Sequence, residues 1–467
     1  MSDLLVRQEV ESIGKLLKKR DLRVHFTGVG GVGMYSLYKN LKLRGFSLTG
    51  SDRGENEYVK RLIASGEKVR VGHAYDNPLG CELLVYNHAI DKENPELKCA
   101  ADNNIKTATR AALLGAVIGE YKHSVGVSGT HGKSTVTAML YHVLSSSASR
   151  ACDVISGASL FESSEPCFFC GSDTILYEAC EYKDSFLRFF PEYSIFLNLE
   201  YDHADYFKSI EDLKASFVSA GRLARHLIVN TDDLNLRSVI CEIDSDVVTF
   251  GSDIHARYRL SDVFENDGKY SFSVCEDGGR VTKIALKILG DFNVYNALAV
   301  FSAASEMGVD REKIKAGIES FLGIARRLEY LGKYKSHPVY YDYAHHPAEI
   351  SGGIKAIAKK HGDAPIVIFR PHTYSRTDAL FDEFVYSLSL AKRALILDID
   401  GIREENASGV SSLKLAEKIG KSATRVTKCD FFDYIDTSNS PIIIMGAADI
   451  SFVKEGMLNY EKGKPAH

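Results

Sequence analysis

The stretch Ser124-Val-Gly-Val-Ser-Gly-Thr-His-Gly-Lys-Ser-Thr135 restricts the fold of this chain more than any other. Its first residues have the apolar pattern of a buried strand, and a glycine-rich loop then leads into a helix. The loop matches the P-loop pattern GxxxxGK[ST], except that Val127 stands at the first glycine position. In such loops, backbone N–H groups hold the β-phosphate of ATP, the lysine reaches the β- and γ-phosphates, and the next hydroxyl binds Mg²⁺. An ATP site is therefore predicted at Gly129, Thr130, His131, Gly132, Lys133, Ser134 and Thr135.

A second glycine-rich loop lies about a hundred residues earlier, at Gly28-Val-Gly-Gly-Val-Gly33. It follows the strand-like run Val24–Thr27 and precedes a helix, and Asp52 ends the next predicted strand. Backbone N–H groups at such a helix start bind a diphosphate, and the later carboxylate accepts from a ribose hydroxyl. A nucleotide site is predicted at Gly28, Gly30, Gly31, Gly33 and Asp52. NAD, FAD and a UDP-sugar share the diphosphate group, so this loop alone leaves the ligand open.

Two nucleotide loops in one chain narrow the class of function. An NAD-dependent oxidoreductase accounts for the first loop and leaves the ATP loop unused. A nucleotide-sensing regulator would bind both ligands without turnover. The pair favours an enzyme that spends ATP on a nucleotide-tagged small molecule.

Length and composition limit the classes of protein to which this chain can belong. The 467 residues suffice for about three domains, and 45% hydrophobic with 25% charged residues is the composition of an ordinary globular protein. A net charge of −5 argues against a nucleic-acid partner. The sequence has no apolar run that could span a bilayer and no secretory leader, so we expect no membrane association. Nine scattered cysteines fit reduced thiols in a cytoplasmic protein.

Strand and helix patterns alternate along the chain, which predicts an α/β fold with parallel sheets. We expect a Rossmann-like domain at 1–121, a P-loop ATPase-like domain with a mixed sheet at 122–324, and a Rossmann-like, doubly wound domain at 325–467. The turn signals Asn266-Asp-Gly268 and Asp277-Gly-Gly279 predict that the central sheet becomes antiparallel. Pro347 begins a helix that buries Ile350, Ile354 and Ile357.

Acidic and histidine residues follow several predicted strands. Glu178 and His203 could hold a second Mg²⁺ beside the ATP phosphates, with Glu181, Asp202 and Asp205 as competitors for that role. The alternative is that they are surface carboxylates and a hydrogen-bonded histidine.

The third predicted domain carries two further polar motifs. Asp342-Tyr-Ala-His-His-Pro347 either caps and packs its helix or takes part in chemistry. Arg370-Pro-His-Thr-Tyr-Ser-Arg-Thr377 leaves a strand end and suits binding of a carboxylate.

Taken together and in order, these motifs resemble the Mur ligase family, in particular its members that add L-alanine to UDP-N-acetylmuramate. The resemblance rests on both loops and on Gly50-Ser-Asp52, Glu178-Ala-Cys-Glu-Tyr182, Asp202-His203, Asp291-Phe-Asn-Val-Tyr-Asn-Ala-Leu298, Arg326-Arg-Leu-Glu329 and the two motifs of the third domain. The sequence departs from the usual family residues at Cys180, at Tyr341 and at Asn87-His88.

The resemblance implies a ligase of peptidoglycan precursor synthesis, in which ATP activates the lactyl carboxylate as an acyl phosphate for attack by L-alanine. It implies UDP-sugar binding by the first loop and Asp52, and MgATP binding by the second loop, with Ser134, Glu178 and His203 on the metal. Further residues receive roles by the same resemblance: Asn293 and Asn296 near the adenine, Arg327 on the γ-phosphate, and Asp342, His345, Arg376 and Thr377 near ATP and the amino acid. A sibling activity, which attaches a recycled tripeptide to the same sugar nucleotide, is the alternative.

Overall fold

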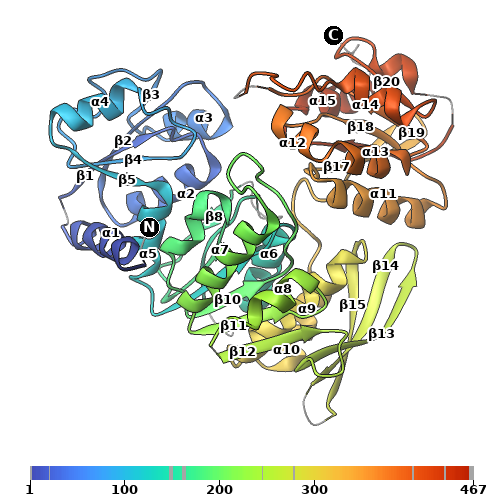
Figure 1. Ribbon diagram of the computed structural model, residues 1–467, viewed down its shortest axis with the longest axis horizontal. Helices are drawn as coiled ribbons and strands as arrows, with labels where there is room; N and C mark the ends of the chain where they lie inside the picture. Colours follow the sequence, from blue (N-terminus) through green and yellow to red (C-terminus); the bar gives the residue numbers. More distant parts are fainter. Residues whose placement is uncertain are drawn as a thin grey trace. The chain divides into compact units, whose positions relative to one another are not determined.

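The computed structural model describes residues 3–19, 21–146, 151–159, 165–244, 246–276, 279–401, 404–435 and 438–461 (Figure 1). Contacts divide the chain into two compact units, and each is described by itself. Unit 1 contains Met1–Asn198 and Lys214–Val248, and unit 2 contains Leu199–Leu213 and Thr249–His467. Helix α7 (Ile210–Leu223) and strand β12 (Asp246–Gly251) each cross from one unit to the other.

Unit 1 begins with a five-stranded sheet in the order β3-β2-β1-β4-β5, and all of its strands are parallel. The strands are β1 Arg23–Thr27, β2 Ser47–Asp52, β3 Val69–Val71, β4 Leu83–Tyr86 and β5 Lys106–Thr109. The helices are α1 Asp3–Leu17, α2 Val32–Leu43, α3 Glu57–Ala64, α4 Pro95–Asp102 and α5 Arg110–Ile118. Val24 and Phe26 of β1 and Leu37 and Leu41 of α2 are fully buried, so apolar residues join this sheet to its helix. The predicted Rossmann-like arrangement of the first loop is confirmed.

The second sheet of unit 1 carries the P-loop and runs in the order β11-β10-β6-β9-β7-β8. The strands are β6 His123–Ser128, β7 Asp153–Ile155, β8 Cys167–Phe168, β9 Thr174–Glu178, β10 Tyr193–Phe196 and β11 His226–Asn230. The helices are α6 Lys133–Ser146, the 3₁₀ segment η1 Tyr182–Arg188 and α8 Leu234–Ile240. Strand β6 lies between β9 and β10 and is parallel to both, so the loop that follows it opens at the carboxyl edge of the sheet.

Unit 2 starts with the antiparallel strands β13 Tyr258–Asn266, β14 Lys269–Glu276 and β15 Val281–Leu289. The predicted antiparallel region is therefore confirmed. Asp267 and Gly268 take left-handed conformations, with φ of 55° and 72°, in the tight turn between β13 and β14. Asp277 and Gly278 of the second turn signal lie outside the described residues. Helices α9 Phe292–Glu306 and α10 Arg311–Ser320 follow.

The last sheet has the order β16-β17-β21-β18-β19-β20 and is parallel except for β16. The strands are β16 Glu329–Tyr334, β17 His337–Asp342, β18 Ile366–Phe369, β19 Arg393–Ile396, β20 Ala423–Arg425 and β21 Ile442–Met445. The helices are α11 Pro347–His361, α12 Tyr374–Ala379, α13 Phe381–Ser389, α14 Ser412–Ile419, η2 Phe431–Tyr434 and α15 Ser451–Glu461. Apolar cores cover both faces, and Ile350, Ile354 and Ile357 are buried in one of them as predicted. The doubly wound character of this sheet is confirmed.

All nine cysteines lie in the described part of the chain and are free thiols. Among the helices that the structure describes, not one combines the length and the apolar character needed to cross a membrane.

Candidate active site

The P-loop is shaped by two glycines and by Asn198. Gly129 and Gly132 have φ of 144° and 85°, which side chains other than glycine rarely tolerate. A Cβ at Gly129 would lie 3.0 Å from Leu197 Cβ and 3.2 Å from the backbone nitrogen of Asn198. The backbone N–H groups of Thr130 and His131 donate to Asn198 O at 3.2 Å and Asn198 Oδ1 at 2.8 Å. Asn198 therefore fixes the loop at the carboxyl edge of β6.

Lys133, the first residue of α6, is held by a carboxylate. Its Nζ lies 3.1 Å and 3.2 Å from the two Glu181 oxygens, and it donates to the carbonyl oxygens of Gly129 and Thr130. Burial would lower the pKa of Lys133, but the attraction of Glu181 outweighs it and raises the pKa above its ordinary value. The loop therefore holds a fixed positive charge, which suits the phosphate role predicted for this lysine.

The predicted metal ligands of unit 1 lie at one sheet edge. Glu178 ends β9 and pairs in register with Val127 of β6, immediately before the loop. Its carboxylate accepts from Ser156 Oγ at 3.0 Å and from the backbone N–H of Gly157. Ser134 and Thr135 lie in the first turn of α6 and are largely buried. A hydroxyl and a carboxylate at the same edge are oxygen donors of the kind Mg²⁺ takes, so the residue types fit the ion.

The first glycine-rich loop is braced by β2. The N–H groups of Gly28 and Val29 donate to Ser51 O at 2.8 Å and 3.0 Å, and the N–H of Gly30 donates to Asp52 Oδ2 at 2.8 Å. Gly31 precedes α2 as its N-cap and supplies no side-chain hydrogen bond, so the first N–H groups of the helix are not capped by a side chain and suit an anion. The structure thus brings Gly28, Gly30, Gly31, Gly33 and Asp52 together. Asp52 supports the loop itself, and a ribose hydroxyl would share its carboxylate.

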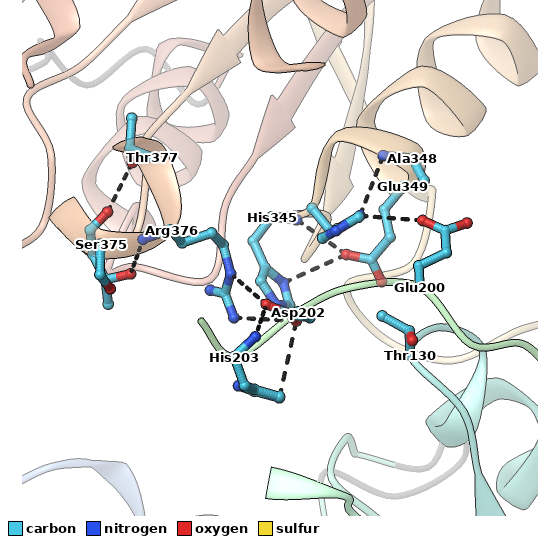
Figure 2. A network of polar contacts seen from close by, with 12 residues as sticks. Thr130, Glu200, Asp202, His203, His345, Ala348, Glu349, Ser375, Arg376 and Thr377 are labelled. Atoms are coloured by element: carbon cyan, nitrogen blue, oxygen red, sulfur yellow. Dashed lines mark hydrogen bonds and ion pairs between the residues drawn. The ribbon is translucent and has the colours of Figure 1, made fainter. Parts of the chain in front are cut away.

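Unit 2 contains a second polar centre, built around Asp202 and Arg376 (Figure 2). Arg376 Nε and Nη2 lie 3.1 Å and 3.3 Å from the two carboxylate oxygens of Asp202. Burial would raise the pKa of Asp202, but Arg376 and the neighbouring histidines lower it below its usual range. His203 has a left-handed backbone, with φ of 57°, and its Nε2 lies 3.9 Å from Asp202. The structure therefore places the predicted metal ligand His203 beside a carboxylate that already binds an arginine.

Glu349 connects the remaining predicted residues of unit 2. Its carboxylate lies 3.0 Å from Arg327 Nη1 and accepts from the backbone N–H of His345 at 3.1 Å. Asp342 ends β17, and its Oδ1 lies 3.9 Å from Arg327. Burial raises the pKa of Asp342 to about 6, against the attraction of Arg327. Burial also lowers the pKa of His345 to about 4, against the attraction of Glu349. A neutral imidazole beside an arginine–carboxylate pair can accept a proton.

Three other predicted residues are engaged within unit 2. Asn293 donates to Leu289 O at 2.7 Å, and Asn296 donates to Asn293 Oδ1 at 2.9 Å, so the two amides form one buried group on α9. Thr377 is fully buried, and its hydroxyl donates to Thr373 O at 2.7 Å. This bond supports the turn at Thr373, whose φ is 69°. The roles of these residues toward ATP and the amino acid remain predictions.

Replacing Asp342 with asparagine is expected to stabilise the protein at alkaline pH. The pKa of Asp342 is about 6 in the folded state and 3.8 in the unfolded state. Deprotonation of this buried carboxyl group therefore lowers the stability of the folded protein as the pH rises from 4 to 6. Asp342→Asn mimics the protonated form, so we expect its free energy of unfolding to exceed that of the parent by about 3 kcal/mol at pH 8 and to match it below pH 4. Hydrogen exchange at the amides of β17 and β21 measures this locally. A variant less stable than the parent at pH 8 would mean that the pairing with Arg327 outweighs burial. The titration of His345 does not affect this difference in stability, because His345 is present in both the parent and Asp342→Asn.

Three family models match consecutive parts of the chain. They are "Mur ligase family, catalytic domain" at residues 23–122, "Mur ligase middle domain" at 127–304 and "Mur ligase, glutamate ligase domain" at 326–438. The chain belongs to the Mur ligase family. The three-domain α/β organisation predicted from the sequence is therefore confirmed, with the first glycine-rich loop, the P-loop and the Arg376 motif each in a different matched domain.

Similar proteins narrow the subfamily of this Mur ligase. It is 36% identical over 452 residues to the UDP-N-acetylmuramate–L-alanine ligase of Clostridium novyi, covering 95% of this chain and 98% of the relative. The enzyme of the same name from Lachnospira eligens is 37% identical over 450 residues, covering 94% and 98%. The UDP-N-acetylmuramate–alanine ligase of Thermotoga maritima superposes with a TM-score of 0.80 at 26% identity, covering 95% of this chain and all of that one. A murein peptide ligase from Psychrobacter arcticus shares the fold, with a TM-score of 0.73 at 20% identity, covering 94% and 98%.

Two acidic residues of this Mur ligase make contacts in the candidate site that the sequence did not predict. Glu181 appeared in the sequence only as a competing metal ligand, yet it is the counter-ion of Lys133. Glu349 drew no prediction, although an acidic residue in the first turn of a proline-initiated helix was a visible signal.

Proposed function

We propose that this Mur ligase joins L-alanine to the lactyl carboxylate of UDP-N-acetylmuramate, with conversion of ATP to ADP and phosphate. The similarity to UDP-N-acetylmuramate–L-alanine ligases over 95% of the chain carries the proposal. The Gly-Lys-Ser core of the P-loop, with its charged Lys133, supports the use of ATP. The product would be an amide in a peptidoglycan precursor.

The proposed reaction has two steps. An oxygen of the lactyl carboxylate attacks the γ-phosphorus, and the bond between the γ-phosphorus and the β-phosphate oxygen breaks. ADP is released, and the lactyl group becomes an acyl phosphate. The amine of L-alanine then attacks the acyl carbon, inorganic phosphate leaves with the bonding electrons, and the amine loses a proton. Lys133 and Arg327 offset the negative charge that otherwise repels a carboxylate from ATP. His345 is the candidate acceptor for the amine proton because it is neutral at physiological pH, although the pKa of about 4 that burial gives it makes it a weak base.

Further proposals concern the ligands and their places. Ser134, Glu178 and His203 would hold Mg²⁺, which supplies charge neutralisation at the phosphates when bound. Residues 1–121 would bind the UDP-sugar, 122–324 the ATP and 325–467 the amino acid, with Arg376 and Thr377 near its carboxylate. The substrates are small molecules, and a net charge of −5 supports the absence of a nucleic-acid partner. Because the reaction consumes ATP, we propose that it takes place in the cytoplasm.

One assay tests the proposal against its alternatives. Phosphate release from ATP is measured with UDP-N-acetylmuramate and either L-alanine, the murein tripeptide or no amine. We expect release only with L-alanine. Release only with the tripeptide would instead assign the recycling reaction, and no release with any amine would contradict ligation altogether.

A further inference from the structure

The motif Arg370–Thr377 is tied to the loop that follows the neighbouring strand of the last sheet. Strands β18 and β19 are parallel partners, and a parallel bridge between His372 and Asp400 extends their pairing beyond both strand ends. The N–H of Asp400 donates to Pro371 O at 2.9 Å, and the N–H of Thr373 donates to Asp400 O at 3.1 Å. The two loops at this carboxyl edge therefore hold each other by backbone hydrogen bonds.

Thr373 is the strained point of this motif. Its φ is 69°, a value that a β-branched residue seldom adopts, so its surroundings must hold the conformation in place. Thr373 is also the N-cap of α12, and its hydroxyl accepts from the N–H of Arg376 at 3.4 Å. This distance is long for a hydrogen bond, so the first turn of α12 depends on a further acceptor.

Glu404, in the loop after β19, is that acceptor. Its Oε2 accepts from the N–H of Ser375 at 2.9 Å, and its Oε1 accepts from the Ser375 hydroxyl at 2.6 Å. The N–H of Glu404 donates to Gly401 O at 3.0 Å. Gly401 lies so close to Tyr374 that a Cβ built on it would overlap the tyrosine ring. The loop after β19 therefore contacts both residues that separate Thr373 from Arg376.

Arg376 follows Ser375 directly and carries the charge of this segment. Ser375, Arg376 and Thr377 succeed one another along α12, and the guanidinium of Arg376 extends to Asp202 (Figure 2). That pair uses Nε and Nη2, so Nη1 lies outside it. The carboxylate of Glu404 already accepts from the start of α12 and would repel a second carboxylate there. The guanidinium is therefore the group of this segment that attracts a substrate carboxylate.

We propose that Glu404 is a positioning residue for the incoming amino acid, because it fixes the turn from Thr373 to Ser375 and thereby directs Arg376 to the substrate carboxylate. This inference rests on the proposed function, in which Arg376 lies near the carboxylate of L-alanine. Glu404 acts through Ser375 and does not itself touch the substrate. Two hydrogen bonds to a charged acceptor keep the backbone before Arg376 in one conformation, and a long side chain would magnify any shift of that backbone at its guanidinium.

The test compares the ligation kinetics of the full chain with those of Glu404→Ala. We expect KM for L-alanine to rise about 10- to 100-fold, by analogy with the loss of an outer hydrogen-bonding partner, while kcat and the KM values for ATP and UDP-N-acetylmuramate stay within about twofold. Glu404→Gln should recover most of the parent KM, because its carbonyl oxygen accepts from the Ser375 N–H and its amino group donates to the Ser375 hydroxyl. Glu405→Ala is the matched control, since this adjacent carboxylate is exposed and forms no hydrogen bond or ion pair with a described residue.

Hydrogen exchange gives a second measurement that needs no turnover. The amide of Ser375 should exchange faster in Glu404→Ala than in the parent, and unchanged exchange would overturn the inference whether or not the chain ligates. A parent that ligates L-alanine, with Glu404→Ala at the parent KM, would overturn the positioning role and leave the proposed function intact. A lower kcat at the parent KM would likewise overturn it, because it would show that Glu404 only stabilises the fold. A parent that releases no phosphate with any amine would contradict both.

Discussion

Lys133→Ala is expected to slow ATP-dependent ligation by about 10²- to 10⁴-fold, by analogy with the loss of one electrostatic donor from a transition state. The structure supplies the reason, because Nζ is fixed at the mouth of the loop by Glu181 and two carbonyl oxygens. A positive charge fixed in this way needs no reorganisation when charge develops on the transferred phosphoryl group. Phosphate release with UDP-N-acetylmuramate, ATP and L-alanine measures the effect. A variant that releases phosphate at the parent rate would refute the assignment of this loop to ATP.

The controls for Lys133 follow from its counter-ion. Removing the lysine leaves the Glu181 carboxylate, which is 2% exposed, without its nearest cation, so the single variant also loses stability. Adding Glu181→Gln to Lys133→Ala removes that buried charge and should restore thermal stability while the enzyme remains slow. Lys122→Ala, an exposed lysine just before β6, should change neither stability nor rate. If misfolding caused the loss of activity, the double variant, with its stability restored, would instead recover the parent rate.

The parts of this protein that sequence predicts well are those that depend on local pattern. Both glycine-rich loops need particular backbone conformations, and the glycines that permit them lie within a few residues of one another, as Gly129 and Gly132 do. The helix that starts at Pro347 was predicted from one proline and three isoleucines spaced along one face. The change to antiparallel pairing after β12 was visible in the turn Asn266-Asp-Gly268.

What the sequence did not reveal are partners that only the tertiary fold brings together. Glu181 is 48 residues from Lys133, and the pair forms because β9 lies next to β6 in the sheet. Arg376 is 174 residues from Asp202. Arg110 is equally inconspicuous in the sequence, since it is one charged residue before eight buried ones on α5 and reads as an ordinary helix start. That no described residue forms an ion pair with its guanidinium is a property of the folded chain.

Glu96 is the buried carboxylate on which the first glycine-rich loop depends. It is fully buried at the start of α4 and accepts from Thr27 Oγ1 at 2.6 Å, Ser51 Oγ at 2.8 Å and Asn77 Nδ2 at 2.6 Å. His25 Nε2 lies 3.2 Å away. Burial alone would raise the pKa of Glu96, but these hydrogen bonds, with those of His25 and His73, lower it well below its usual range. The carboxylate therefore joins β1, β2 and the segment after β3.

Glu96→Ala is expected to reduce the free energy of unfolding of the first sheet by about 3–5 kcal/mol, because it leaves several buried donors without an acceptor. Ser51 is among them, and its carbonyl holds the N–H groups of Gly28 and Val29, so nucleotide-sugar binding should weaken as well. Hydrogen exchange at the amides of β1 and β4 measures the local loss. Glu93→Ala, an 80% exposed residue paired with Lys98, should change it by less than about 0.5 kcal/mol.

The pH dependence of stability shows whether Glu96 supports the loop through its negative charge or only through its shape. A carboxylate whose folded pKa lies below its ordinary 4.5 contributes stability above that pH and loses it as the pH falls. Glu96→Gln keeps the shape without the charge, so the parent should be more stable than this variant at pH 7, and the difference should shrink steadily below pH 4.5. A difference that stays constant from pH 7 to pH 3 would mean that the charge of Glu96 is irrelevant and that only its shape supports the loop.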